Sequence, residues 1–354
     1  MLPEIHTRLR LAIMILSTTV AGVTGALAEP PSPPPDLPPY AVSQAVTQPR
    51  LFAENVVSTP DDEIGGTFSP DGTEFYFTKL VSYTTFPRIG VICVTHYQNG
   101  KWTEPEILPF SGTYLDFPPK LSPDGKRMFF SSTRPHPTDQ ARAMRIWVAD
   151  RTADGWSQPQ PLDAPINAPG TRWNSDPSLT RDGTIYFSSD REKPGALHIY
   201  RSRLIDGKYA EPEKLGPAIN SAFTEYQPYV SPDERILLFA AGPSIDPPYP
   251  HREEELETGG NPYPRSDLFV SVRINGEWTP ARHLGHGINT FAEEEYPILT
   301  PDGRYLFFGS ERSAFTVPVE RRLGYDGLRR ALNSTLNGHG NIFFVDAQAM
   351  ELTQ

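Results

Sequence analysis

The stretch Ser122-Pro123-Asp124-Gly125, followed by Met128-Phe129-Phe130-Ser131, decides the fold because close copies of it occur four more times. The turn phrase reads Ser/Thr-Pro-Asp-Gly or a near variant, and its copies begin at Ser69, Ser122, Thr180, Ser231 and Thr300. Self-similarity at intervals of about fifty residues is the mark of a repeat architecture. Pro presets φ, Asp bonds its own backbone and Gly adopts the left-handed conformation, so each phrase predicts a tight hairpin.

Each repeat contains strand-like runs on both sides of this turn. In the second repeat, residues 119–122 precede it, while residues 128–131 and 145–148 follow it and are rich in aromatic and β-branched side chains. Such runs, bounded by turn residues, predict strands. An Asp-Gly pair at 154–155, matched by Asn-Gly or Asp-Gly in three other repeats, predicts a hairpin that opens a fourth strand.

Four antiparallel strands repeated radially form a β-propeller. We therefore predict an all-β fold, a single propeller of five four-stranded blades. Six blades are the alternative if residues 40–57 hold further structure. The last repeat lacks a fourth strand, and residues 47–52 resemble residues 103–108 of the first repeat. We expect this N-terminal segment to pair with the C-terminal blade and close the ring, which removes an exposed edge.

Two insertions and two substitutions interrupt the symmetry. Residues 244–265 predict a long surface loop in the fourth blade. Residues 313–340 of the last blade contain a predicted helix that we expect to cap the propeller, with an apolar stripe formed by Leu328, Ala331, Leu332 and Leu336 and with Gly338 past its end. Glu234 stands in place of the turn glycine in the fourth blade and predicts a distorted turn, while Arg181 replaces the proline in the third.

The N-terminal residues have the pattern of a targeting segment. Arg8 and Arg10 precede an apolar run over 11–25, and Ala26-Leu27-Ala28 fits a cleavage site. We predict a signal peptide over 1–28, with an uncleaved anchor as the alternative, then a Pro-rich linker over 29–44 and the propeller over 45–354. The expected location is periplasmic or secreted, with no transmembrane segment after the signal.

The net charge indicates which partners to expect, and the cysteine content indicates whether disulfides can form. The formal net charge of −11 disfavours nucleic acid, because an acidic surface repels phosphate backbones. The chain has one cysteine, so no internal disulfide forms, and Cys93 lies in an apolar run where a buried, inert thiol is expected. We expect a monomer.

The repeated motifs of the chain resemble those of a known family. The Ser-Pro-Asp-Gly phrase and the Phe-Phe-Ser-Ser run are similar to the WD40-like (PD40) propeller repeat of TolB-type domains and many exported bacterial proteins. The resemblance covers nearly all of residues 45–354, and residues 325–346 look like the C-terminal blade of one exported group within it. It implies a propeller and export. It implies no particular chemistry.

One polar residue lies six positions before each turn phrase, and the five are Glu63, Asp116, Asn174, Glu225 and Glu294. Propeller blades begin at the central channel, so this register predicts a polar ring at one mouth, with Asp176 and Glu295 close by. Converging oxygens can hold Ca²⁺ or another divalent cation, or a hydroxyl-rich ligand. The alternative is that they bond the backbone of neighbouring blades. Trp173 lies beside this ring and can stack on a sugar or pack internally.

Three functions remain open at this stage. The first is an exported binding module that holds a glycan, a peptide or an envelope protein at the channel mouth. The second is a carbohydrate-active hydrolase or lyase in which Asp116, Glu225 and Glu294 supply the carboxylates. The third is a structural component of the cell envelope. The fold does not choose among them, because propellers host all three.

Overall fold

The computed structural model describes residues 37–81, 89–137, 143–242, 265–315 and 322–352. The predicted signal peptide and most of the predicted linker lie outside these residues, as does nearly all of the predicted loop over 244–265. Residues from Pro38 onward form one compact unit. Tyr40 is already buried in it, with its ring 4.8 Å from that of Phe68, so packing against the propeller begins before residue 45.

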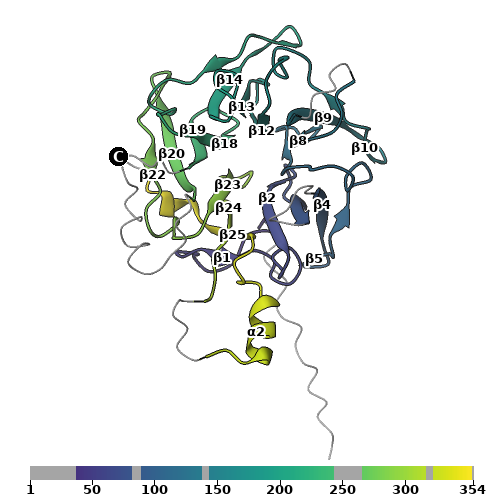
Figure 1. Ribbon diagram of the computed structural model, residues 1–354, viewed down its shortest axis with the longest axis vertical. Helices are drawn as coiled ribbons and strands as arrows, with labels where there is room; N and C mark the ends of the chain where they lie inside the picture. Colours follow the sequence, from purple (N-terminus) through teal and green to yellow (C-terminus); the bar gives the residue numbers. More distant parts are fainter. Residues whose placement is uncertain (1–36, 82–88, 138–142, 243–264, 316–321, 353–354) are drawn as a thin grey trace, which may run out of the picture. The chain divides into compact units, whose positions relative to one another are not determined.

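Five antiparallel sheets surround a central axis, which confirms the five-bladed propeller (Figure 1). The inner strand of each blade leads into the turn phrase, and the second and third strands lie progressively outward. The three inner strands of the first three blades are β2 (Asp62–Phe68), β3 (Glu74–Val81) and β4 (Ile89–Gln98); β7 (Lys120–Leu121), β8 (Arg127–Ser132) and β9 (Arg145–Thr152); and β12 (Asn174–Leu179), β13 (Ile185–Ser189) and β14 (His198–Ser202). Those of the last two are β18 (Glu225–Val230), β19 (Ile236–Ala241) and β20 (Asp267–Ile274); and β23 (Glu294–Leu299), β24 (Tyr305–Ser310) and β25 (Asn341–Asp346).

The outermost part of each of the first four blades contains more than one short strand, whereas the sequence predicted a single fourth strand. The aromatic residue after each Asn-Gly or Asp-Gly turn lies in a two-residue strand, and a separate edge strand follows it. The hairpin strands are β5 (Lys101–Trp102), β10 (Gly155–Trp156), β15 (Leu204–Ile205) with β16 (Lys208–Tyr209), and β21 (Glu277–Trp278). The edge strands are β6 (Glu106–Ile107), β11 (Gln160–Pro161), β17 (Glu213–Lys214) and β22 (Arg282–His283).

The ring closes as predicted, between the two ends of the propeller. β1 (Arg50–Leu51) pairs antiparallel with β25, with Arg50 opposite Phe344 and Leu51 opposite Phe343. Phe52 follows directly and is buried where the last blade meets the first. The same cluster contains Cys93, which is buried as expected, and burial raises the pKa of its thiol to about 11.

The turn phrase forms the same hydrogen bonds in every blade. The first hydroxyl donates to the aspartate, as from Ser122 Oγ to Asp124 Oδ1 at 2.6 Å, and that Oδ1 accepts the backbone N–H two residues later. Glu234 corrects the expectation of a distorted turn. It adopts φ 57° and donates its N–H to Ser231 O at 2.8 Å, as the glycines do. Its carboxylate accepts from Tyr186 Oη and pairs with Arg201 and Arg273, contacts that offset the left-handed backbone.

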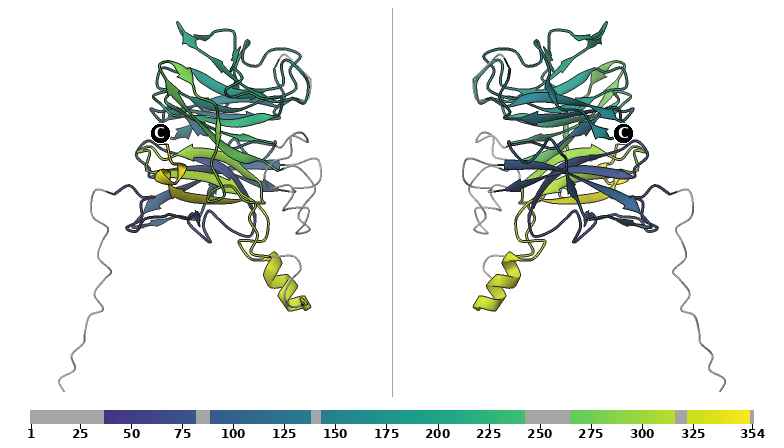
Figure 2. Two further views of the ribbon diagram at one scale, coloured as in Figure 1. Left: turned by 90° about the vertical axis from the view of Figure 1, so that its left-hand side faces the viewer. Right: turned by 90° about the vertical axis from the view of Figure 1, so that its right-hand side faces the viewer.

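The predicted helix forms but does not cap the propeller. α2 (Tyr325–Leu332) has no buried residue, and it ends before Asn333 rather than near Gly338. Leu328 and Leu332 are exposed, whereas Leu336, beyond the helix, packs against the core between the last two blades. Figures 1 and 2 show α2 projecting beside the last blade, away from the central axis. Leu328 and Leu332, the exposed part of the apolar stripe, therefore have no covering surface among the described residues. Within the same ranges, no helix is long and apolar enough to cross a membrane.

Candidate functional site

Four of the five polar residues of the predicted ring lie at or next to the starts of the inner strands, and Asp116 lies shortly before β7. The side chains of all five are buried. Their exposed fractions are 0% for Glu63, Asp116, Asn174 and Glu294 and 2% for Glu225. The four carboxylates each accept from a hydroxyl of the preceding loop, which belongs to Thr59, Ser111, Ser221 or Thr290. Asn174 instead donates from Nδ2 to Thr171 Oγ1. The hydroxyls and the ring residue come from the same stretch of chain, so each contact fixes the entry into its own blade.

The second and fifth blades show how fully these carboxylates are used. Asp116 accepts from Ser132 Oγ at 2.6 Å and from both terminal nitrogens of Arg134, at 2.9 and 3.0 Å. Glu294 accepts from Ser310 Oγ at 2.9 Å and lies 3.4 Å from Arg312 Nε. Such saturated, buried carboxylates favour a stabilising role, through bonds within a blade rather than to the backbone of the next one. A ligand-binding role for these five residues stays a prediction.

Two residues after each ring residue, the backbone comes close to the channel axis. Gly65, Asp176, Gln227 and Tyr296 occupy this position with φ between 41° and 55°, and Pro118 takes it in the second blade. A Cβ on Gly65 would lie 2.5 Å from the Cβ of Tyr296 and 3.0 Å from that of Pro118. This close approach separates the channel into two ends. Asp176, predicted as a ligand-binding residue, is buried here and accepts from Ser175 and Ser188.

The first end of the channel is bordered by the residues on either side of the buried ring position. Trp173, another predicted site residue, is 36% exposed, and its indole Nε1 donates to Ser175 Oγ at 2.9 Å. Its ring centroid lies 6.2 Å from that of Phe117 in the second blade, which lies 6.5 Å from Tyr296 of the fifth. The mouth is thus partly aromatic, with one large ring open to solvent.

Carboxylates of the fifth blade complete this mouth. Burial, and then the nearby charge of Glu311, raise the pKa of Glu293 to about 7. Burial also raises the pKa of Glu295 well above its usual value, with Glu293 and Glu311 adding to the effect. Gln227 Nε2 donates to Glu295 Oε2 at 3.2 Å, and Arg265 pairs with Glu311. Glu293 can therefore act as a hydrogen-bond donor near neutral pH, whereas ordinary surface carboxylates cannot.

Trp173 and Glu295 of this mouth were among the residues predicted from the sequence, whereas Phe117, Glu293 and Glu311 were not. The available signal was strand alternation, because the neighbours of a buried position point to the other face. Among the described residues, no group of three or more His, Cys, Asp or Glu side chains is arranged to hold a metal ion. The Ca²⁺ site therefore stays a prediction without support from these side chains.

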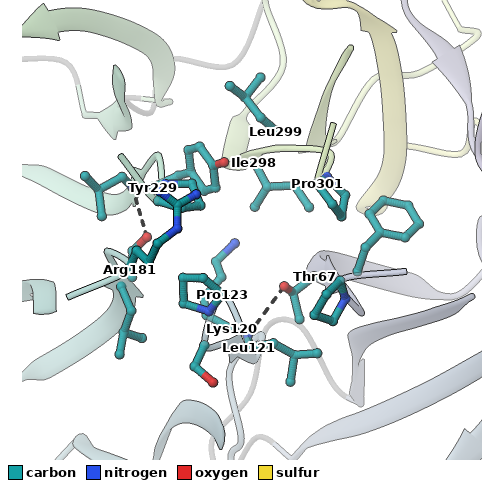
Figure 3. Close-up of a pocket in the computed structure, with 16 residues that line it drawn as sticks. Thr67, Lys120, Leu121, Pro123, Arg181, Tyr229, Ile298, Leu299 and Pro301 are labelled. Atoms are coloured by element: carbon teal, nitrogen blue, oxygen red, sulfur yellow. Dashed lines mark hydrogen bonds between the residues drawn. The ribbon is translucent and has the colours of Figure 1, made fainter. Parts of the chain in front are cut away.

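The opposite end of the channel holds an axial pocket of about 240 Å³ (Figure 3). The second residue of all five turn phrases lies around it, and these are Pro70, Pro123, Arg181, Pro232 and Pro301. Lys120, from the inner strand of the second blade, lines the pocket and directs its amine toward the middle. Its Nζ donates to Gly66 O of the first blade at 3.1 Å. Burial lowers the pKa of Lys120 to about 7, an effect that Asp176 partly offsets.

We expect Lys120→Met to change how stability depends on pH. The unfolded lysine keeps its proton to about pH 10.4 and the folded one only to about pH 7, so the unfolded state binds more protons between these values. Stability of the wild type therefore rises as pH increases through 7. Between about pH 6 and pH 8 it should gain about 1.4 kcal/mol relative to Lys120→Met, measured by urea unfolding. Lys126→Met removes an exposed lysine of the same turn and should show no such difference. A pH-independent gap between wild type and Lys120→Met would contradict the prediction.

No protein-family model and no curated protein matches the chain. Several solved structures are similar to it. The putative TolB from Agrobacterium tumefaciens is 16% identical with a TM-score of 0.43, over 81% of this chain and 91% of that one. The catalytic domain of the Coprinopsis cinerea GH62 α-L-arabinofuranosidase is 11% identical with a TM-score of 0.43, over 85% and 98%. Oligogalacturonate lyase from Vibrio parahaemolyticus is 13% identical with a TM-score of 0.40, over 83% and 68%. At these identities the likeness concerns the β-propeller fold, and function has to be argued from the site.

Proposed function

We propose that this protein is a binding module that holds a hydroxyl-rich ligand, such as a glycan, at the mouth bordered by Trp173. The observation that carries the proposal is a partly exposed indole at the end of the channel to which the fifth blade adds Glu293 and Glu295, whose pKa values burial raises. An aromatic face packs against the C–H face of a sugar ring, and carboxyl groups both donate to and accept from sugar hydroxyls. Trp173 is also oriented before binding, because its N–H is already bonded to Ser175.

The geometry at this mouth favours a polar, uncharged ligand. Phe117 and Trp173 supply an apolar wall, while Glu293 and Glu295 supply polar groups from the fifth blade. Asp62 lies close enough to influence the pKa of Glu295, so the acidic side of the mouth reaches the first blade. An anionic ligand would meet these acids unfavourably. The proposal includes the export expected from the sequence, which would bring this mouth into contact with envelope glycans.

We expect Trp173→Ala to weaken glycan binding by up to about tenfold, since an aromatic contact contributes about 0.5–1.5 kcal/mol beyond the area it buries. Isothermal titration calorimetry against a panel of glycan fragments measures this loss, with wild-type tryptophan fluorescence as a second signal. Tyr325→Ala removes an aromatic that is 75% exposed on α2 and should bind as the wild type does. Binding that survives Trp173→Ala unchanged, or no binding to any glycan fragment while a peptide binds, would rule out this mouth as a glycan site.

A hydrolase or lyase is the second candidate, and the pKa of Glu293 near 7 is the observation that favours it. A carboxyl group that titrates near neutrality suits general acid catalysis. Glu293→Gln should then abolish turnover of a bound glycan while binding persists. The carboxylates first expected to react, Asp116, Glu225 and Glu294, are fully engaged inside the blades. Absence of turnover by the wild type would leave the binding module as the function, and turnover that is insensitive to Glu293→Gln would contradict the role of Glu293.

A further inference from the structure

The axial pocket differs in charge from the rest of the chain. The formal net charge is −11, yet the sixteen described residues that line the pocket include two cations, Lys120 and Arg181, and no acid. Lys120 is 6% exposed, so its amine meets the pocket rather than bulk solvent. Asp176 is the acid whose charge acts on Lys120; burial raises the pKa of Asp176, and its carboxyl group accepts from Ser175 and Ser188.

Lys120 interrupts a pattern that three of the other four blades follow, since Ile298 occupies this position in the fifth blade. The residue two positions before each turn phrase faces the pocket, and in three blades it carries a hydroxyl, from Thr67, Ser178 and Tyr229. Ser178 Oγ accepts the N–H of Val230 in the next blade at 2.9 Å, and Thr67 Oγ1 accepts that of Leu121 at 3.5 Å. Each hydroxyl oxygen is thus occupied as an acceptor, and its proton remains for donation.

Arg181 interrupts the second pattern, the ring of turn prolines. Its backbone N–H donates to Pro232 O at 2.8 Å, which links the third turn to the fourth. Its side chain lies at the pocket wall beside Tyr229. Both departures from the repeat add a cation, and both face the same space. The turn aspartates lie on this face as well, but each accepts from the hydroxyl of its own turn, as Asp124 does from Ser122.

We propose that the axial pocket is a binding site for a small organic carboxylate, held by Lys120 and Arg181. The hydroxyls of Thr67 and Ser178 supply further donors, and Phe68, Val230 and Ile298 are among the apolar residues that receive the body of the ligand. A volume of about 240 Å³ suits a small molecule rather than a polymer. This site lies at the other end of the channel from the proposed glycan mouth and does not depend on it.

Binding to this pocket is coupled to a proton. Without ligand, burial keeps the pKa of Lys120 near 7, with Asp176, Arg181 and Tyr229 as its ionisable neighbours. A carboxylate beside the amine favours the charged form, so the complex takes up a proton at pH 8. A purely structural lysine would show no ligand-linked uptake.

The test is calorimetric titration of the intact chain with benzoate, neutral benzamide or inorganic phosphate at pH 8. Tris and HEPES buffers, which differ in ionisation enthalpy, report proton uptake.

We expect benzoate to bind with uptake of up to about one proton and benzamide not to bind. Lys120→Met should lose about 10- to 100-fold in benzoate affinity, as expected for a charge-assisted hydrogen bond. Arg181→Gln should lose about tenfold, while Arg235→Gln, an exposed cation of the adjacent turn, should not change it.

Each other outcome overturns the proposal. Equal binding of benzamide and benzoate would show that charge is not recognised. Benzoate binding that is unchanged in both Lys120→Met and Arg181→Gln would place the site elsewhere. Binding of phosphate without benzoate would replace the carboxylate assignment. Absence of proton uptake in the wild type would contradict the role of Lys120, even if its variant failed to fold.

Discussion

Replacing Asp116 by alanine is expected to cost about 3–5 kcal/mol of the free energy of unfolding, because it leaves a buried cation without its partner. Arg134 is 8% exposed and donates two hydrogen bonds to Asp116. Its guanidinium carbon also lies 4.8 Å from the ring centroid of Phe130. Moving the guanidinium into solvent would break that contact. Ser132 and Ser111 lose an acceptor as well. Urea unfolding of the wild type and the variant measures the loss.

Two further variants define the origin of this effect. Asp150→Ala removes a carboxylate that is 73% exposed and lies 3.7 Å from Arg127, and it should cost less than about 1 kcal/mol. Asp116→Ala combined with Arg134→Met removes both buried charges and should be more stable than Asp116→Ala alone. If the single variant unfolds at the same urea concentration as Asp150→Ala, the buried pair contributes little and this account of the polar ring is incorrect.

Phe52→Ala is expected to cost about 3–5 kcal/mol, since it leaves a cavity where the first and last blades meet. The ring centroid of Phe52 lies 5.0 Å from that of Phe307, 5.2 Å from Phe75 and 5.4 Å from Trp102. The preceding strand β1 pairs with β25 over only two residues, so Phe52 supplies much of what holds the N-terminal segment to the last blade. Differential scanning calorimetry gives the loss, and limited proteolysis near residue 50 reports release of the segment.

The matched control for Phe52 is Ile107→Ala. Ile107 is 60% exposed on the edge strand β6, and its truncation should change stability by no more than about 0.5 kcal/mol. Detachment of β1 would also expose the edge of β25, so Phe52→Ala should aggregate more readily than Ile107→Ala. Equal unfolding temperatures for the two variants would show that the closure does not depend on this ring.

Much of the architecture was predictable because its determinants are local and repeated. Each Ser/Thr-Pro-Asp-Gly phrase bonds within itself, as Ser122 does with Asp124, so its effect does not depend on the rest of the chain. The match between residues 47–52 and 103–108 likewise predicted ring closure. The helix was found, but its capping role was wrong, because a stripe of apolar residues indicates a helix and does not indicate what covers it.

The site was less predictable because it depends on where the inner strands change register. The pairing shifts between Ser175 and Ser178, between Tyr226 and Tyr229, and between Glu295 and Ile298. Left-handed residues that are not glycine, such as Asp176, Gln227 and Tyr296, make these bulges possible. One extra residue in a strand reverses the face of everything that follows, and no local pattern in the sequence marked these positions.

The sequence by itself determined the five blades, their turns and the strand that closes them, since these follow from short-range hydrogen bonding and strand periodicity. The tertiary structure alone decided which polar residues are buried and which border the channel. It buried Glu63, Asp116, Asn174, Glu225 and Glu294 within the blades, and it left Trp173 open at one mouth. At the other end it set Lys120 against Gly66, 54 residues away. These outcomes depend on desolvation and on contacts between blades, which exist only once the ring has closed.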